Sequence, residues 1–299
     1  MLTVAKKWLA GLMATLLLPA AANAADAPRP DANPALWVVK DADTTIYMFG
    51  TFHLLDGKRD WFNDEVKTAF DASSELMLEA ILPENLAEMQ PLVLKYAVDP
   101  KGRTLTQKLS PAIKAKLDKE LGALGVPPKA FDPLEPWFVS MTLTSMGAQR
   151  LGLKPEFGPE AILMKAAKER GTTIGELEGI ERQLSIFDRL PEAAQIASME
   201  ETLGDMPKLG EKLQPLLNAW TSGDTEGLVR LLDEGADKQP ELRKAMFTDR
   251  NAEWAEWVSE RMQKPGTVFM AVGAGHLGGK DSVQSFLAKK GLKAERVKN

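Results

Sequence analysis

The sequence predicts an α/β (α+β) protein with a central mixed sheet, which the N- and C-terminal segments form around a large helical insertion. Three observations lead to this class. Short β-rich runs lie near both ends of the 299-residue chain, and helical patterns fill its middle. Two of the β-rich runs, 223 positions apart, end in the same glycine-led motif with a histidine.

The N-terminal β-rich region starts with "LWVVKD" and "TTIYMFG", two runs joined by a short turn. Their composition and short connection predict a hairpin over 36–50. Apolar side chains recur near helical spacing over 61–72 and predict a helix there. The run "ELMLEAIL" at 75–82 is bounded by serine and proline, which predicts a buried strand.

Residues 84–150 read mainly as helices. The segment "SPAIKAKLDKELGALG" has Ser110 in the N-cap position, Pro111 at the first helical position and a glycine stop at Gly122 or Gly125. The segment "LEPWFVSMTLTSMGAQRLG" predicts an apolar helix that starts at Pro136.

The second half of the chain returns from helices to strands. "GPEAILMKAAKERG" at 158–171 predicts a helix, and "TTIGELE" is a candidate strand. Residues 181–262 are again helical, with a long amphipathic helix near 240–262. The last segments, "TVFMAVGAGH", "DSVQSFLAKKG" and "LKAERV", predict strand, helix and strand. We therefore expect one domain over 36–299, with the helical insertion at about 84–262.

Residues 1–24 have the pattern of a secretory signal peptide. Lys6 and Lys7 precede a short apolar stretch, and the small residues Ala22 and Ala24 define a cleavage site before Ala25. Residues 25–35 are rich in proline, alanine and aspartate, which predicts a disordered leader after cleavage. The apolar stretch is too short for an ordinary membrane span. We expect a periplasmic protein without stable membrane insertion once the signal is removed.

Composition narrows the classes of partner. Loss of the two lysines in the signal peptide takes the formal net charge from −5 to −7. A mildly acidic surface argues against nucleic acid as a partner. The chain has no cysteine, so disulfides and thiol catalysis are excluded.

The two histidines share one sequence frame. "IYMFGTFHLLDG" and "FMAVGAGHLGGK" align with His53 on His276, each three residues after a glycine that ends an apolar run. Glycine permits close backbone approach, and sites in open α/β sheets form outside the carboxyl ends of strands. We therefore expect both histidines in one site. The alternative for each is an ordinary packed or hydrogen-bonded imidazole.

Two converging imidazoles with a carboxylate nearby suit a divalent metal. Glu79 is the nearest candidate, since an acid inside "LMLEAIL" is costly to bury unless it is paired, metal-bound or catalytic. Its alternative role is simply to mark the exposed end of the strand. Neither an HExxH helix nor a G-x-S-x-G elbow occurs in the sequence.

The motifs "MFGTFHLLD" and "VGAGHLGGKDSVQSFLAKKGLKAERV" resemble those of the TraB/GumN family, to which the Tiki metalloproteases are related. The resemblance covers roughly residues 36–298, with weaker landmarks at "LMLEA", "LEPW", "GPEAILMKAAKERG", "IGELEGIERQLSIFD" and "DRNAEW". It implies a metal-dependent, hydrolase-like site on a fold shared with erythromycin-esterase-like and ChaN-like proteins.

The resemblance also implies functional roles for individual residues. It implies that His53 and His276 are the motif histidines and that Glu79 is the essential acid of the Tiki proteins. Glu178 and Arg250, the latter followed by Asn251, match recurrent polar positions. The acid before Arg250 is aspartate here, where the family usually has glutamate.

The residue pattern and the family resemblance favour one mechanism, in which His53 and His276, with Glu79 as ligand or base, hold a divalent metal (Mn, Co or Zn) that polarises a peptide carbonyl. Glu178 is the expected general base, and Arg250 the expected oxyanion stabiliser. The alternative for Glu178 is a cap or an ion pair on a loop, and the alternative for Arg250 is a salt bridge on the surface of a helix. The expected partner is a peptide or protein substrate.

Two other classes of function stay open at the level of sequence. One is a periplasmic protein that binds haem or a peptide without turnover, with the histidines as axial haem ligands. The other is a degenerate family member that acts as a scaffold for a partner.

Overall fold

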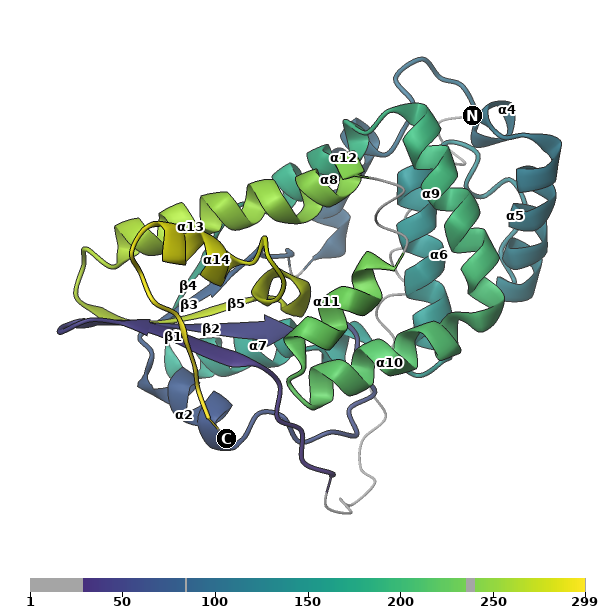
Figure 1. Ribbon diagram of the computed structural model, residues 1–299. Helices are drawn as coiled ribbons and strands as arrows, with labels where there is room; N and C mark the ends of the chain where they lie inside the picture. Colours follow the sequence, from purple (N-terminus) through teal and green to yellow (C-terminus); the bar gives the residue numbers. More distant parts are fainter. Residues whose placement is uncertain (1–28, 84, 235–239, 299) are drawn as a thin grey trace. The chain divides into compact units, whose positions relative to one another are not determined.

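The computed structural model describes residues 29–83, 85–234 and 240–298 (Figure 1). These residues form two compact units. A helical unit contains 82–150 and 180–209, and a sheet unit contains 29–81, 151–179 and 210–298. Much of the range 84–262, expected as a helical insertion, therefore belongs to the sheet unit.

The sheet unit is built on six strands in the order β4-β3-β5-β2-β1-β6. The strands β4, β3, β5 and β2 run parallel to one another, while β1 is antiparallel to both β2 and β6. The predicted α/β class with a mixed sheet is confirmed. The strands are β1 (Leu36–Lys40), β2 (Thr44–Thr51), β3 (Glu75–Leu78), β4 (Thr173–Glu176), β5 (Gly266–Gly273) and β6 (Glu295–Arg296).

Helices cover both faces of this sheet (Figure 1). On one face α13 (Asp249–Arg261) and α14 (Val283–Lys289) pack on fully buried side chains of β2 and β5. On the other lie α2 (Asp64–Ala72) and α7 (Pro159–Arg170), where the ring of Phe70 meets that of Phe269 at 5.5 Å. Alternation along β2 and β5 thus supplies two cores, as expected for a sheet buried on both sides.

The remaining helical segments of the sheet unit lie around the ends of the strands. They are η2 (Pro155–Phe157), α10 (Leu209–Thr221), α11 (Thr225–Asp233), α12 (Pro240–Arg243), the π-helix η5 (Lys244–Thr248) and η6 (Ala274–Leu277). The long helix predicted near 240–262 is therefore three consecutive segments, α12, η5 and α13.

Several predicted boundaries differ from the observed ones. The hairpin over 36–50 and the C-terminal strand–helix–strand order are confirmed. The helix predicted at 61–72 begins only at Asp64, because Trp61 is buried and stacks on Phe49. The strand predicted at 75–82 ends at Leu78, after which Glu79 turns toward an arginine partner.

The last residues of the predicted leader are part of the sheet unit. The prediction of disorder over 25–35 is wrong for its last residues, since Ala32 donates to the Asp60 carbonyl at 2.9 Å. Ala32 and Ala35 are both buried against the sheet unit, where their small side chains fit. The predicted signal peptide at 1–24 lies outside the described residues. Within the described ranges, none of the helices has the length and apolar character needed to span a membrane.

The helical unit has its own apolar cores. Its α5 begins as predicted, with the Ser110 side chain accepting from Ile113 N–H, and ends at Gly125, whose φ of 72° favours glycine. Its segments are η1 (Leu86–Met89), α3 (Gln90–Tyr96), α4 (Leu105–Lys108), α5 (Pro111–Leu124), α6 (Pro136–Arg150), α8 (Ile180–Asp188), α9 (Glu192–Asp205) and η3 (Met206–Lys208).

The buried centre of β5 should dominate the stability of the sheet unit. Met270→Ala removes a side chain that is 0% exposed, and we expect it to lower the free energy of unfolding by roughly 2–5 kcal/mol. Met141→Ala, at a side chain 45% exposed, is the matched control and should change it by less than about 1 kcal/mol. Urea unfolding followed by circular dichroism measures both. Equal losses would contradict this account of the core.

Candidate functional site at the carboxyl edge of the sheet

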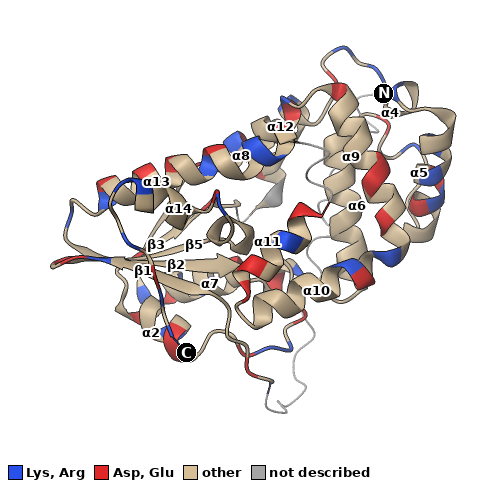
Figure 2. Cartoon of the chain, in the orientation of Figure 1, with Lys and Arg blue, Asp and Glu red and all other residues tan. Residues whose placement is uncertain are grey.

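Four chemically reactive side chains follow the carboxyl ends of four neighbouring parallel strands. His53 follows β2, His276 follows β5, Glu79 follows β3 and Glu178 follows β4. The strands β2 and β5 themselves carry no charged residue, so charge collects only beyond their ends (Figure 2). The two histidine strands are direct neighbours in parallel register, with Thr51 opposite Gly273. The repeated motif therefore brings its two copies to one edge of the sheet.

The glycines of the two motifs are required by close packing. A Cβ on Gly273 would lie 3.3 Å from Glu79 Oε1 and 3.5 Å from His276 Cδ2. A Cβ on Gly50 would lie 3.1 Å from the Cα of Ala274. The contacts at 3.1 and 3.3 Å are tighter than most real Cβ contacts, so a side chain at either glycine would push on the motif or on Glu79. Glycine acts here through close approach, since neither residue has a positive φ.

His276 is buried and held at both ring nitrogens. Its Nδ1 lies 2.6 Å from Asn251 Oδ1, and its Nε2 lies 3.1 Å from Arg250 Nη1. The rings of Phe247 and Trp254 flank it at centroid distances of 4.9 and 4.5 Å. Burial in this ring environment, with the neighbouring positive charge of Arg250, lowers the pKa of His276 to about 3. The imidazole is therefore neutral at pH 7.

Arg250 is the centre of the ion pairs at this edge. From the first turn of α13 its Nη2 donates to Glu79 Oε2 at 2.6 Å, and its Nε donates to both oxygens of Glu178 at 3.0 and 3.1 Å. Its guanidinium carbon lies 4.6 Å from the ring centroid of Trp254. The Arg250 side chain is 4% exposed and that of Glu178 is 1% exposed. Glu178 and Arg250 are thus a buried pair.

Glu79 is also largely withdrawn from solvent, at 12% exposure. The alternative in which it marks an exposed strand end is therefore wrong. Its Oε1 accepts from the Gly273 N–H at 2.6 Å and lies 3.8 Å from His276 Nε2. Burial raises the pKa of the Glu79 carboxyl, but His276, Arg250, His53 and the Gly273 amide together lower it to about 2. Glu79 is ionised at neutral pH.

His53 has a carboxylate partner that no sequence motif indicates. Its Nδ1 lies 2.6 Å from an oxygen of Glu160, in the first turn of α7. The charge of Glu160 raises the pKa of His53, although solvent around an imidazole that is 69% exposed screens part of the effect. Gly158 is required beside it, since a Cβ there would lie 2.3 Å from the His53 carbonyl oxygen. The only sequence signal was an acid near a helix start.

Both histidines are thus held through Nδ1, His53 by Glu160 and His276 by Asn251. Two imidazoles with carboxylates are donors that suit a first-row divalent metal. In the described ranges, no three histidine and acidic side chains are arranged to hold a metal ion. Arg250 instead occupies this place with its positive charge. It donates hydrogen bonds to His276 Nε2, Glu79 and Glu178. The donor types fit a metal, provided that the guanidinium withdraws.

The buried neutral state of His276 should make the protein sensitive to mild acid. Since its folded pKa of about 3 lies below the unfolded value of 6.5, only the unfolded state takes up this proton between those values. The resulting stability is complete above pH 6.5 and falls by at most about 1.4 kcal/mol per pH unit as the pH drops toward 3. His276→Gln should flatten the pH dependence of the free energy of unfolding between pH 6.5 and 4.5.

That window isolates His276 among the site residues. Below pH 6.5 His53, whose pKa is raised, is protonated in both states, and Glu79 begins to contribute only below pH 4.5. Urea midpoints at half-unit pH steps measure the slope. Parallel slopes for the wild type and His276→Gln would contradict a buried neutral imidazole.

Comparison with known proteins agrees with the resemblance seen in the motifs. A model of the TraB/PrgY/gumN family matches residues 35–296. The uncharacterized protein YbaP of Escherichia coli (strain K12) is 27% identical over 192 residues, which cover 64% of this chain and 71% of that protein. An uncharacterized protein of Treponema pallidum (strain Nichols) is 24% identical over 272 residues, 86% of this chain and 80% of that protein. No solved structure matched. The chain belongs to the TraB/PrgY/gumN family.

Proposed function

We propose that this protein is an exported metal-dependent hydrolase, and specifically a peptidase, with its site at the carboxyl edge of the sheet. The observation that carries the proposal is the convergence of both motif histidines and Glu79 beyond three neighbouring parallel strands. His53, His276 and Glu79 would hold a divalent metal such as Mn, Co or Zn. These residues would thereby gain a Lewis acid, which would supply a water of lowered pKa and polarise a peptide carbonyl.

Glu160 and Asn251 prepare the two histidines for this role. Each engages Nδ1 of its histidine, which leaves Nε2 as the atom for ligation. A carboxylate hydrogen-bonded to the ring nitrogen that does not bind the metal also increases the basicity of an imidazole ligand. The proposed function thus assigns to Glu160 the task of orienting His53.

A single movement of Arg250 would complete the site. Its guanidinium contacts His276 Nε2, Glu79 Oε2 and both oxygens of Glu178. Withdrawal frees the His276 nitrogen for ligation and releases Glu178 to accept a proton as general base. The released guanidinium can then stabilise the oxyanion that forms on the substrate carbonyl. In the described arrangement Glu178 instead holds Arg250.

Replacing either histidine by alanine should reduce metal affinity and peptide hydrolysis by at least about 100-fold, since each supplies a ligand. The double variant should be scarcely worse than either single variant, because residues that act as a unit are non-additive. Titration with Mn²⁺, Co²⁺ and Zn²⁺ by calorimetry measures the affinity, and a peptide library followed by mass spectrometry measures the hydrolysis.

Acid variants provide a matched pair for the same assays. Glu79→Gln should abolish hydrolysis, whereas Glu211→Gln, an exposed acid of α10, should leave it unchanged. Absence of hydrolysis by the wild type, together with a histidine-dependent Soret band on haem titration, would replace this proposal with the haem-binding one. Partner binding that persists in the double histidine variant, again without hydrolysis, would favour a scaffold.

Export is the second part of the proposal, and it is supported by the charged, apolar and small-residue regions of residues 1–24. N-terminal sequencing of the protein recovered from the periplasm of an expressing bacterium should begin at Ala25. Lys6→Glu with Lys7→Glu should slow export, because it removes the positive charge of the signal, whereas Lys40→Glu should not. A membrane-bound product that retains Met1 would contradict cleavage.

A further inference from the structure

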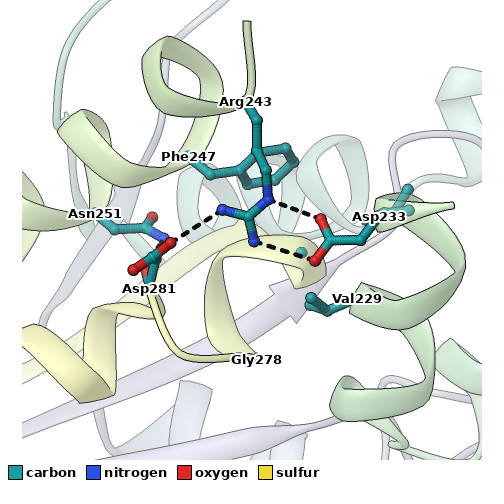
Figure 3. Close-up of a pocket in the computed structure, with 9 residues that line it drawn as sticks. Val229, Asp233, Arg243, Phe247, Asn251, Gly278 and Asp281 are labelled. Atoms are coloured by element: carbon teal, nitrogen blue, oxygen red, sulfur yellow. Dashed lines mark hydrogen bonds and ion pairs between the residues drawn. The ribbon is translucent and has the colours of Figure 1, made fainter. Parts of the chain in front are cut away.

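A small pocket is lined by two residues that contact His276, namely Phe247 and Asn251 (Figure 3). Phe247, Asn251 and Gly275 line it, together with three charged residues, Asp233, Arg243 and Asp281. The Arg243 guanidinium binds both oxygens of Asp233, at 2.9 and 3.1 Å, and donates from Nη1 to Asp281 Oδ2 at 3.0 Å. Arg243 thereby ties the end of α11 to the turn that precedes α14.

The hydrogen bonds behind His276 determine the orientation of one amide. Asn251 Nδ2 donates to the backbone carbonyl of Asp281 at 2.7 Å, so Asn251 Oδ1 faces His276 Nδ1 at 2.6 Å. An amide oxygen only accepts, so Nδ1 must carry the proton. His276 Nε2 is then free to accept from Arg250 Nη1 at 3.1 Å. A single tautomer satisfies every bond.

The opposite orientation of the amide would reverse this pattern. A flipped Asn251 would place its oxygen against the Asp281 carbonyl, where two acceptors repel each other. Its NH₂ group would face His276 Nδ1 and force the imidazole proton onto Nε2. That N–H would then oppose the N–H groups of Arg250, and Nε2 would be lost as an acceptor. The position of the Asp281 carbonyl and the donor groups of Arg250 therefore favour the same tautomer of His276.

We propose that Arg243 is a positioning residue that fixes the tautomer of His276 through Asp281 and Asn251. Its two-oxygen contact with Asp233 orients the guanidinium, which holds Asp281 and hence the carbonyl that receives Asn251. The inference deepens the proposed function and rests on it only for the use of Nε2 as a ligand. Arg243 itself touches neither histidine in this arrangement.

Nuclear magnetic resonance reads the tautomer directly, because the chain contains only two histidines. In ¹⁵N-labelled protein at one neutral pH, long-range ¹H–¹⁵N correlations distinguish the Nδ1–H from the Nε2–H form. His53→Gln leaves His276 as the sole source of these signals. We expect a single Nδ1–H pattern for His276, and loss of that single pattern in Arg243→Met. Asn251→Leu, which removes the selecting amide, should lose it as well.

Matched variants separate positioning from general damage. Arg243→Lys keeps a charge near Asp281 and should retain the Nδ1–H pattern. Arg230→Met removes an exposed arginine from α11 and should also retain it. Should Arg243→Met fail to fold, Asp281→Asn tests the same link. It keeps the backbone carbonyl that receives Asn251 and removes the side-chain charge that pairs with Arg243.

A folded Arg243→Met or Asp281→Asn protein with an undisturbed Nδ1–H pattern would overturn the inference. Retention of that pattern in Asn251→Leu would also overturn the inference, because it would show that the Asn251 amide does not control the tautomer of His276. Neither readout depends on hydrolysis, so failure of the peptidase proposal and failure of this inference are told apart.

Discussion

The burial of the Arg250 guanidinium is the constraint on which the edge of the sheet depends. A buried charge without partners is very costly, and removing one partner of a buried pair typically costs 3–5 kcal/mol. Arg250 is paired with Glu79 from the end of β3 and Glu178 from the end of β4. The start of α13 is thereby fixed over two strand ends. Since its Nη1 also reaches His276, the same side chain ties in the end of β5.

The two copies of the sequence motif place their histidines in different environments, because the elements around each copy differ. After β5 the chain enters η6, and His276 is enclosed by the rings of Phe247 and Trp254. After β2 the chain enters an irregular segment, and His53 remains 69% exposed beside Glu160. The pKa of the inner imidazole is lowered by burial and that of the outer one is raised by Glu160, so the two histidines favour different charge states. Of the two imidazoles, that of His53 is the one accessible to solvent.

Much of the sheet and the placement of the two histidine motifs at one edge of it followed from the sequence, because apolar runs, glycines and histidines are local signals. Glu160 did not, since it lies 107 positions from His53 and looks like any acid in the first turn of a helix. The contact between Asn251 and Asp281 was equally hidden, because its acceptor is a backbone carbonyl with no sequence signature. The π-helix η5 was missed because an inserted residue barely alters a helical pattern.

The segment 243–251 shows how such hidden contacts are encoded. Arg243, Phe247 and Asn251 follow one another at intervals of four and, with Arg250, lie along one side of the helical path through η5. On an ordinary amphipathic helix this stripe would be apolar. Here three of its four members are polar, and all four act around His276, three by direct contact and Arg243 through Asp281. Polar groups in a stripe that packs around a buried histidine are tolerable only where they find partners. Such departures concentrate at functional sites, and this one surrounds the histidine that closes the second motif.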